Sequence, residues 1–582
     1  MANIYERASQ ILGNLKLTSD NVDMVDCYYL CANKQHIIDL QTKDHQVIWG
    51  RRGTGKTTLM KAFTYNTNYV LQDPETTAIY IVMASVIPTE EEIASLTDDG
   101  SSLALYVFSK LIGRINSELE KLYNIRSGAM STDAEKNFLG AFYELEDYLE
   151  IYRTCIQGGE ISIENLKSNE LKKELGREIS TNINASENAV NLCMNLFRNK
   201  NTTNNSKQSI AITGKIQFIL ETEVISNLIT KMLDAFGIRL AYICLDEYSE
   251  MDKISEFSIQ SKVAQLIKQV FFKNPKYSIK IATIWNYSKL HTRGGNRVEG
   301  IEYQHDIFEG PDLDIMFMEC NADIISYFKE VLVNTYLMGH DIKDEEKSAL
   351  SDYIESYIFT KPGLRHLICG SQGVSRTFII LVKTYLQRFI KQKNGPVKLA
   401  SVYEIIKHHY LEDVRSKIPY YSVYRSVDRY ISKKLCRYFL FTRDDYNRCK
   451  SLIKYLSSRG VFMQMPGHLT DREIRDDYKL FVIHYGNYLD ALESDTCRRG
   501  RKTLGEDAKL EADGMLIPEY SSDLIDSPES YTVHIPENAE LEAYCTRCSK
   551  IIADNSSGNR VVCPHCGHEM LRFAEFIDEV SL

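Results

Sequence analysis

A glycine-rich turn at residues 50–58 carries the side chains in this 582-residue chain whose types and spacing best suit chemistry. It follows the apolar run Gln46–Trp49 and leads into an apolar helical pattern. Glycines here let backbone N–H groups curl around phosphate oxygens, and a helix N-terminus adds partial positive charge. Lys56 suits the β- and γ-phosphates and the Thr57 hydroxyl suits Mg²⁺. The predicted nucleotide-binding residues are Gly50, Arg51, Arg52, Gly53, Thr54, Gly55, Lys56, Thr57 and Thr58.

Two adjacent acids form the second candidate for chemistry. The segment Leu240–Glu247 reads LAYICLDE, an apolar strand that ends in Asp246 and Glu247. Asp246 would join the Mg²⁺ shell, and Glu247 would orient and polarise the attacking water. Paired with the phosphate loop, these acids predict Mg²⁺-dependent hydrolysis of ATP to ADP and phosphate rather than binding alone.

Four clustered cysteines predict a metal site of another kind. Cys545-x-x-Cys548 and Cys563-x-x-Cys566 are separated by 14 residues, a spacing typical of two knuckles around one tetrahedral Zn²⁺. Four thiolates leave no open coordination position, so this zinc is expected to be structural. We interpret His565 and His568 as neighbours of the ligands. The other ten cysteines are scattered singly, as is typical of reduced thiols inside a cell.

The elements that must position these residues form an alternating pattern of strands and helices. Apolar strands are predicted at 46–49, 78–83, 240–245, 279–285 and 314–318. Such strands, separated by helical stretches, favour an α/β fold with a parallel sheet covered on both faces. The long helical stretch between the second and third strands, about 90–235, exceeds what a crossover needs, so it is predicted to be an insertion.

The order of these motifs resembles AAA+ ATPases, in particular the origin-recognition (ORC-type) initiator branch, over about residues 25–490. The resemblance rests on the phosphate loop, the strand ending LDEYS, Asn286 after the fourth strand, and Gly373-Val374-Ser375-Arg376. It implies that Asn286 senses the γ-phosphate and that Arg376, on a helical lid, touches the same phosphate. It also implies an arginine that reaches a neighbouring subunit's nucleotide, for which Arg293 and Arg297 are both candidates, and hence a homo-oligomer. The long insertion departs from the family pattern.

The resemblance and the composition together divide the chain into five parts. They are an AAA+ core at 1–320, a helical lid at 321–392, a basic winged-helix-like domain at 393–502, an acidic linker at 503–542 and a zinc ribbon at 543–582. The net charge of the whole chain is −10, and residues 506–542 alone hold 11 acids against one lysine. Residues 391–438 hold 11 Lys or Arg against four acids.

The basic segment predicts a nucleic-acid contact. Its cations alternate with tyrosines, and such cations can neutralise phosphates while the tyrosines bond to them or pack on sugars. The cations are Lys407, Arg415, Lys417, Arg425, Arg429, Lys433, Lys434 and Arg437, with a further run at 498–502; the tyrosines are Tyr410, Tyr420, Tyr421, Tyr424 and Tyr430. A protein partner for the same surface, or an ordinary solvated face, remains an alternative.

Composition excludes several classes of protein. Hydrophobic residues are 44% and charged residues 25%, close to globular averages, so bulk disorder and fibrous repeats are excluded. No window matches a membrane span and residues 1–17 do not match a signal peptide, so a cytoplasmic protein without membrane contact is expected. We predict an oligomeric, DNA-coupled ATPase switch, for which the resemblance suggests antiviral defence or the control of replication or mobile elements. The alternative is a nucleotide-gated scaffold with negligible turnover that recruits a protein effector.

Overall fold

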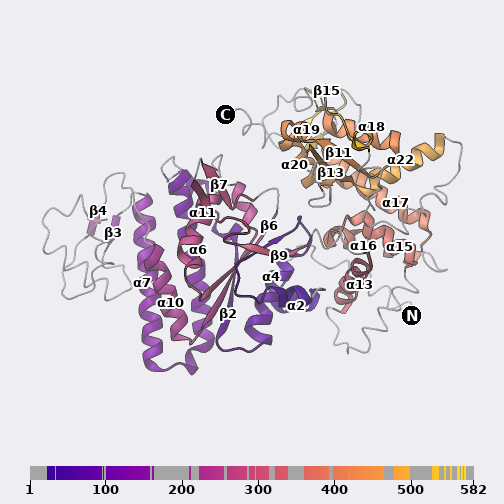
Figure 1. Cartoon of the computed structure of the whole chain (residues 1–582). Coiled ribbons are helices and arrows are strands. Elements are labelled where there is room, and N and C mark those ends of the chain that lie inside the picture. The colour runs from indigo at the N-terminus through magenta and orange to yellow at the C-terminus, as the bar shows by residue number, and fades with distance from the viewer. Residues whose placement is uncertain are drawn as a thin grey trace. The chain divides into compact units, whose positions relative to one another are not determined.

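The structure is a computed structural model that divides into two compact units (Figure 1). One unit comprises Thr18–Gly50 and Lys56–Asp312, and the other comprises Arg51–Gly55 and Leu313–Leu582. The residues that the structure describes are 22–32, 34–94, 96, 100–157, 160–162, 209–211, 222–253, 259–284, 288–294, 297–313, 321–337, 359–391, 397–418, 420–464, 477–498, 527–536, 543–544, 551–552, 560–563, 565–567 and 569–571.

A five-stranded parallel sheet forms the centre of the first unit. Its strands are β1 (Gln46–Trp49), β2 (Thr76–Val82), β5 (Leu240–Asp246), β6 (Tyr277–Thr283) and β9 (Phe308–Asp312), in the order β2-β5-β6-β1-β9. All residues of β1, β5 and β6 are buried, as expected for a parallel sheet with both faces covered. The predicted α/β sheet is therefore confirmed, and the first four strands end within two residues of the predicted bounds.

The strand register brings the predicted motifs to one edge of the sheet. Val82 pairs with Asp246, and Trp49 pairs with Thr283. Because the strands are parallel, their carboxyl ends meet at the same edge, where ligands of such sheets bind. With β6 between β1 and β5, the loop after Trp49 and the acids after Leu245 start about 10 Å apart, two strand spacings.

The fifth strand of the sheet, β9, is a strand that the sequence analysis did not predict. The predicted strand at 314–318 lies outside the described residues, and β9, at Phe308–Asp312, pairs with β1. β9 contains Gly310 and Pro311, which weaken a strand signal in sequence. Proline is tolerated there because β9 has a neighbour on one side only.

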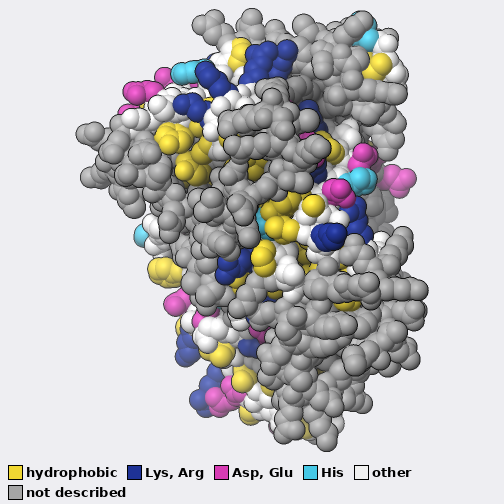
Figure 2. Space-filling view, turned by 90° about the vertical axis from the view of Figure 1, so that its right-hand side faces the viewer, with side chains coloured by type: hydrophobic (Ala, Val, Ile, Leu, Met, Phe, Trp, Pro, Cys, Tyr) yellow, Lys and Arg dark blue, Asp and Glu magenta, His cyan; other side chains and the backbone are white. Residues whose placement is uncertain are grey.

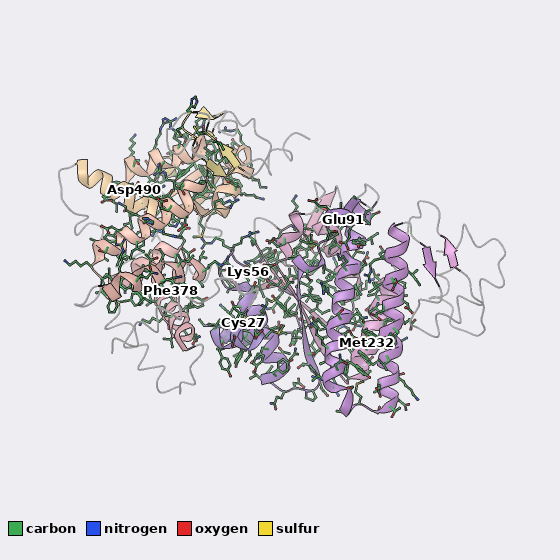
Figure 3. All side chains as sticks on the ribbon, turned by 180° about the vertical axis from the view of Figure 1, so that it is seen from behind. Cys27, Lys56, Glu91, Met232, Phe378 and Asp490 are labelled. Carbon is green, nitrogen blue, oxygen red and sulfur yellow. The ribbon has the colours of Figure 1, made fainter. Side chains whose placement is uncertain are left out.

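Helices cover the sheet, and the long helices among them that the structure describes within residues 90–235 belong to the predicted insertion. The insertion helices α6 (Gly100–Arg126), α7 (Thr132–Gln157) and α10 (Thr222–Ala235) lie side by side (Figure 1). Their buried faces join the sheet core, as Met232 on α10 does (Figure 3). The other elements of this unit are α2 (Met24–Leu30), α3 (Lys34–Asp39), α4 (Lys56–Tyr65), α5 (Glu90–Ala94), α11 (Gln260–Ile267), and the strand pairs β3 (Glu160–Ser162) with β4 (Ser209–Ala211) and β7 (His291–Gly294) with β8 (Arg297–Gly300).

The second unit combines helices with a small antiparallel sheet. Its sheet has the order β11-β13-β12. The elements are α13 (Asn321–Leu337), α15 (Lys361–Ser371), α16 (Ser375–Lys391), α17 (Leu399–His409), α18 (Ser422–Lys434), β11 (Tyr438–Thr442), α19 (Arg443–Arg448), α20 (Lys450–Ser458), β12 (Phe462–Gln464), β13 (Tyr478–Ile483) and α22 (Tyr485–Arg498).

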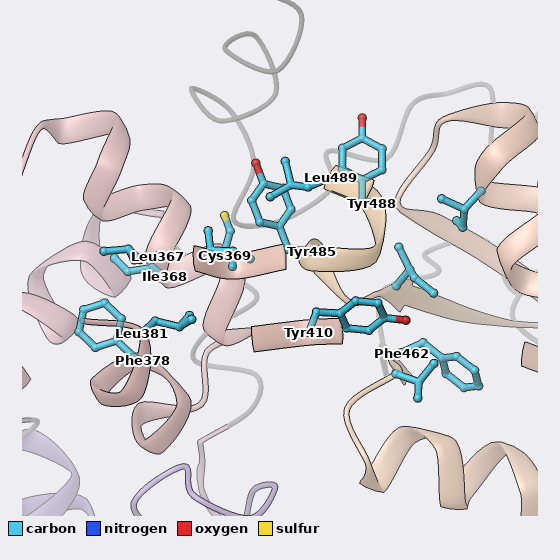
Figure 4. Packing of buried hydrophobic residues seen from close by; sticks show 14 of the residues in the cluster. Leu367, Ile368, Cys369, Phe378, Leu381, Tyr410, Phe462, Tyr485, Tyr488 and Leu489 are labelled. Atoms are coloured by element: carbon cyan, nitrogen blue, oxygen red, sulfur yellow. The ribbon is translucent and has the colours of Figure 1, made fainter. Parts of the chain in front are cut away.

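One hydrophobic core joins helices α13, α15 and α16 to the segment that follows them. Figure 4 shows Leu367 of α15 and Phe378 of α16 in the same cluster as Tyr410, Phe462 and Tyr488 of the later segment. Shared burial of this kind opposes independent movement of the two segments.

The C-terminal residues add short strands to this unit. β14 (Ala543–Tyr544) pairs with β10 (Tyr420–Tyr421) and with β15 (Ile551–Ile552), and β16 (Arg560–Val562) forms a hairpin with β17 (Glu569–Leu571). Within the described ranges, no helix has both the length and the apolar character that a membrane crossing requires.

Candidate nucleotide-binding site

The phosphate loop leads directly from β1 into α4. Helix α4 begins at Lys56, whose ammonium Nζ lies 2.5 Å from the carbonyl oxygen of Gly50 and donates a hydrogen bond to it. Figure 3 shows Lys56 at the start of this helix. Its first-turn N–H groups lack intrahelical acceptors, so the loop and the helix start present donors of the type that bind phosphate.

Asp246 and Thr57 come together at the carboxyl edge of the sheet. Asp246 is only 1% exposed, and its carboxylate accepts hydrogen bonds from the Thr57 side chain and from the Tyr80 hydroxyl, the latter at 2.8 Å. Burial raises the pKa of the Asp246 carboxyl, whereas these hydrogen bonds and the charge of Lys56 lower it. A divalent cation would oppose the effect of burial, so this pair of oxygen donors fits Mg²⁺ chemically.

Glu247 has an unusual backbone conformation. It is a non-glycine residue with φ of 58°, and its N–H donates to Oδ1 of Asp246 at 2.9 Å. Side chains rarely adopt this left-handed conformation, and such residues cluster at functional sites. The turn ties the position of Glu247 to the carboxylate beside it.

Tyr80 is a site residue that the sequence analysis missed. It lies on β2, is nearly buried, and donates its hydroxyl proton to Asp246. Burial and the nearby Asp246 carboxylate raise the pKa of the Tyr80 hydroxyl, which keeps it protonated as a donor. The only trace in sequence is one tyrosine inside the apolar run 78–83.

In the second unit, the phosphate-loop residues Arg51–Gly55 lie against the turn that carries Arg376. The backbone N–H of Arg376 donates to the carbonyl oxygen of Gly53 at 3.1 Å, and the Arg376 side chain is exposed. A Cβ on Gly53, whose φ is +85°, would lie 3.0 Å from atoms of Val374 and Arg376. The structure thus brings together two motifs that are more than 300 residues apart in sequence.

Three other predicted residues are placed only in part. Asn286 lies outside the described residues, just beyond the end of β6. The backbones of Arg293 and Arg297 lie on β7 and β8, where Gly294 pairs with Arg297. That hairpin follows β6, the fourth predicted strand.

The second cysteine pair lies in a tight hairpin turn. Cys563 and Cys566 lie between β16 and β17, Cys563 is 1% exposed, and the N–H of Gly567 donates to the Cys563 carbonyl at 2.9 Å. Cys545 and Cys548 lie outside the described residues, and the described portion of the chain contains no cluster of three or more metal-ligating side chains. The turn geometry suits a metal knuckle, because both cysteines lie in one tight turn.

Part of the predicted basic and tyrosine-rich surface is engaged in contacts within the protein. Lys407 forms ion pairs with Asp490 and Glu493, and Arg415 lies 3.8 Å from Asp428. Tyr410, Tyr421 and Tyr424 are buried, and the guanidinium of Arg437 lies 4.8 Å above the Tyr485 ring.

Ion pairs therefore engage some of the cations predicted to contact nucleic acid, and the nucleic-acid contact itself stays a prediction. Arg415 lies between an acid of α18 and an acid of α22, 3.8 Å from Asp428 and 3.9 Å from Asp490. Arg429, Lys433 and Lys434 are exposed. Figure 2 shows Lys and Arg side chains of the described surface in separate groups, with acidic and hydrophobic side chains between them.

Comparison with known proteins agrees with the site. Residues 28–309, just under half of the chain, match the model of the ORC-CDC6-like family. The match supports an ATP-binding AAA+ protein of the ORC/CDC6 type, and the matched range contains the phosphate loop, strands β1, β2, β5 and β6, and both acids. No match is found among curated proteins.

Proposed function

We propose that the protein hydrolyses ATP with Mg²⁺ and acts as an oligomeric, DNA-coupled molecular switch. The observation that carries the proposal is the meeting of Thr57 and Asp246, two hard oxygen donors, beside the phosphate loop. A site that only held phosphate would not need a buried carboxylate there, because an uncompensated buried charge is unfavourable.

Each residue has a distinct task in this mechanism. Backbone N–H groups of the loop and the Lys56 ammonium bind the phosphates, and Thr57 and Asp246 hold the cation. Bound Mg²⁺ would neutralise charge on the β- and γ-phosphate oxygens. Glu247 accepts a proton from the attacking water and orients it toward the γ-phosphorus.

The remaining roles follow from the family resemblance. Asn286 and Arg376 contact the γ-phosphate, and Arg293 or Arg297 acts on the nucleotide of a neighbouring subunit, which requires a homo-oligomer. Residues 393–502 act as a winged-helix-like domain that contacts DNA through exposed cations. The biological settings that fit are antiviral defence and the control of replication or mobile elements.

The C-terminal segment is proposed to be a zinc ribbon. Cys545, Cys548, Cys563 and Cys566 would hold one structural Zn²⁺, and the turn at Cys563–Gly567 supports this by placing two of the four sulfurs in one hairpin. The ribbon and the acidic linker are then available for a protein effector.

Steady-state ATP hydrolysis tests the proposal. We expect Mg²⁺-dependent turnover by the wild-type protein that duplex DNA stimulates. Glu247→Gln is expected to bind ATP but to lose at least about 99% of turnover, within the range for removal of a general base. Lys56→Ala is expected to lose ATP binding, because the Lys56 ammonium is the proposed partner of the β- and γ-phosphates.

The controls separate the two functional classes. Full hydrolysis by Glu247→Gln would contradict the role of that residue. ATP that stays bound and intact in the wild-type protein, with and without DNA, would contradict the ATPase and favour the nucleotide-gated scaffold.

A further inference from the structure

Within the second unit, two hydrogen bonds connect residues 51–53 of the phosphate loop to the turn Gln372–Arg376. The Arg51 guanidinium donates from Nη2 to the carbonyl oxygen of Gln372 at 2.5 Å. Four residues further along, the N–H of Arg376 donates to the carbonyl oxygen of Gly53 at 3.1 Å. The turn Gln372–Arg376 is therefore held at both of its ends by residues 51–53.

The acceptor of Arg51 belongs to a stiff element. Gln372 ends α15 in a left-handed conformation with φ of 52°, and its own N–H donates to Cys369. Gly373 follows with φ of +76°, and the N–H of Val374 donates to Ser371 at 3.0 Å. Because these hydrogen bonds fix the end of α15, a displacement of the Gln372 carbonyl also moves the start of α16, where Arg376 lies.

Residues that follow in the chain of this unit lie near the turn Gln372–Arg376 and near Arg51. The Gln372 side-chain oxygen lies 3.9 Å from the position of a Cβ on Gly460, in the tight turn before β12. Burial lowers the pKa of His484, and the charges of His409, Arg437 and Arg51 lower it further, so Arg51 lies within electrostatic reach of that residue. The printed hydrogen bond directs the guanidinium toward the end of α15, at the Gln372 carbonyl oxygen.

We propose that Arg51 is a positioning residue, which fastens the turn carrying Arg376 to the phosphate loop instead of binding phosphate itself. This inference rests on the proposed function, because the turn matters for catalysis only if Arg376 acts on the nucleotide. An arginine suits the task, since a charge-assisted hydrogen bond to a carbonyl is stronger than a neutral one. Arg51 thereby couples the conformation of the loop to the position of Arg376.

Hydrogen exchange of the full-length protein tests the contact without any assumption about ATP. In Arg51→Ala, amides of residues 374–378 are expected to exchange about tenfold faster, because a charged hydrogen bond that holds the turn is lost. Arg51→Lys should restore part of the protection of these amides from exchange, since lysine keeps the positive charge but lacks the planar guanidinium group. Arg52→Ala, which removes the same charge from the next position, is the control and should leave this exchange unchanged.

Kinetics then separate positioning from phosphate binding. Arg51→Ala is expected to lower kcat about tenfold while its ATP affinity, measured by titration with a fluorescent ATP analogue, changes less than about threefold. Gln372→Gly should retain activity, because it keeps the acceptor carbonyl and glycine accepts the left-handed conformation.

The outcomes are distinguishable. Unchanged exchange in Arg51→Ala, equal acceleration in Arg52→Ala, or a loss of ATP affinity parallel to the loss of kcat would each overturn the positioning role. A wild-type protein without ATP turnover would contradict the proposed function, and the exchange experiment would still decide whether Arg51 holds the turn.

Discussion

The Tyr80 hydroxyl donates a 2.8 Å hydrogen bond to the carboxylate of Asp246 from the neighbouring strand of the sheet. Asp246 also accepts from Thr57, so two hydroxyl donors support one buried acid. These hydrogen bonds lower the pKa of the Asp246 carboxyl against the larger effect of burial, which raises it. The charged form that a cation site needs is thus favoured partly by a residue that would touch neither nucleotide nor metal.

Replacing Tyr80 tests that support. In Tyr80→Phe the Asp246 carboxylate loses a donor, so its pKa rises further and a larger fraction is protonated at a given pH. We expect the acid limb of the ATPase pH profile to move to higher pH and the Mg²⁺ requirement to increase. The free energy of unfolding should fall by about 1–3 kcal/mol.

A second buried tyrosine supplies the control. Tyr242 lies on β5, and its hydroxyl donates to the Gln41 carbonyl at 2.7 Å. Tyr242→Phe should cost comparable stability without changing the pH profile or the Mg²⁺ requirement. Equal pH profiles for the wild type and Tyr80→Phe would show that the hydroxyl does not govern the ionisation of Asp246.

Gly53 provides a test of the close approach between loop and turn. In Gly53→Ala the new methyl group would lie 3.0 Å from atoms of both Val374 and Arg376, in a left-handed conformation that already disfavours alanine by about 1–2 kcal/mol. We expect ATP affinity to fall about tenfold or more, because a shift of roughly 1.4 kcal/mol equals that factor. Isothermal titration calorimetry measures it.

The matched control for Gly53→Ala is the same substitution at an exposed glycine within a helix. Gly140, on α7, has nothing within 4 Å of its Cβ position, so Gly140→Ala should stabilise the protein by about 0.5–1 kcal/mol. ATP binding should stay the same in this variant. Normal ATP affinity in Gly53→Ala would mean that the loop accommodates the methyl group while keeping the backbone conformation that binds phosphate.

The exposed cations of α18 make the DNA proposal specific. If Arg429, Lys433 and Lys434 contact phosphates, replacing all three by alanine should reduce the slope of log affinity against log salt by up to about three. Lys407→Ala should instead lower stability and leave the slope unchanged, because Lys407 is paired with Glu493. Fluorescence anisotropy at several salt concentrations measures the slope. An unchanged slope in the triple variant would remove these residues from any DNA surface.

The sequence predicted those parts of the site that depend on local chemistry. The phosphate loop needs glycines, a lysine and a hydroxyl within nine residues of the chain. The apolar run of strand β5 predicts a buried strand that ends at Asp246. Local patterns therefore sufficed to place β1, α4 and β5, because each motif and the element it requires are adjacent in the chain.

Contacts between distant segments could not be predicted in this way. The partnership of Tyr80 with Asp246 depends on the register of β2 against β5, which no local pattern contains. Likewise, Lys407 had the appearance of a surface cation because its partners, Asp490 and Glu493, lie more than 80 residues away on α22. Charge counts along the chain do not distinguish a solvated cation from one neutralised by tertiary packing.

The proposed zinc site gives the last prediction. Purified protein should contain about one Zn²⁺ per chain, as expected for four thiolates around one tetrahedral ion. Cys563→Ser should lose most of the metal, because Cys563 is 1% exposed and directed into the fold, where a hydroxyl replaces a thiolate poorly. His565→Ala should keep its zinc, since His565 is exposed in the turn between the two cysteines. Elemental analysis by plasma mass spectrometry separates these results. Zinc retained in Cys563→Ser, or lost equally in His565→Ala, would contradict a four-cysteine site and favour a histidine ligand.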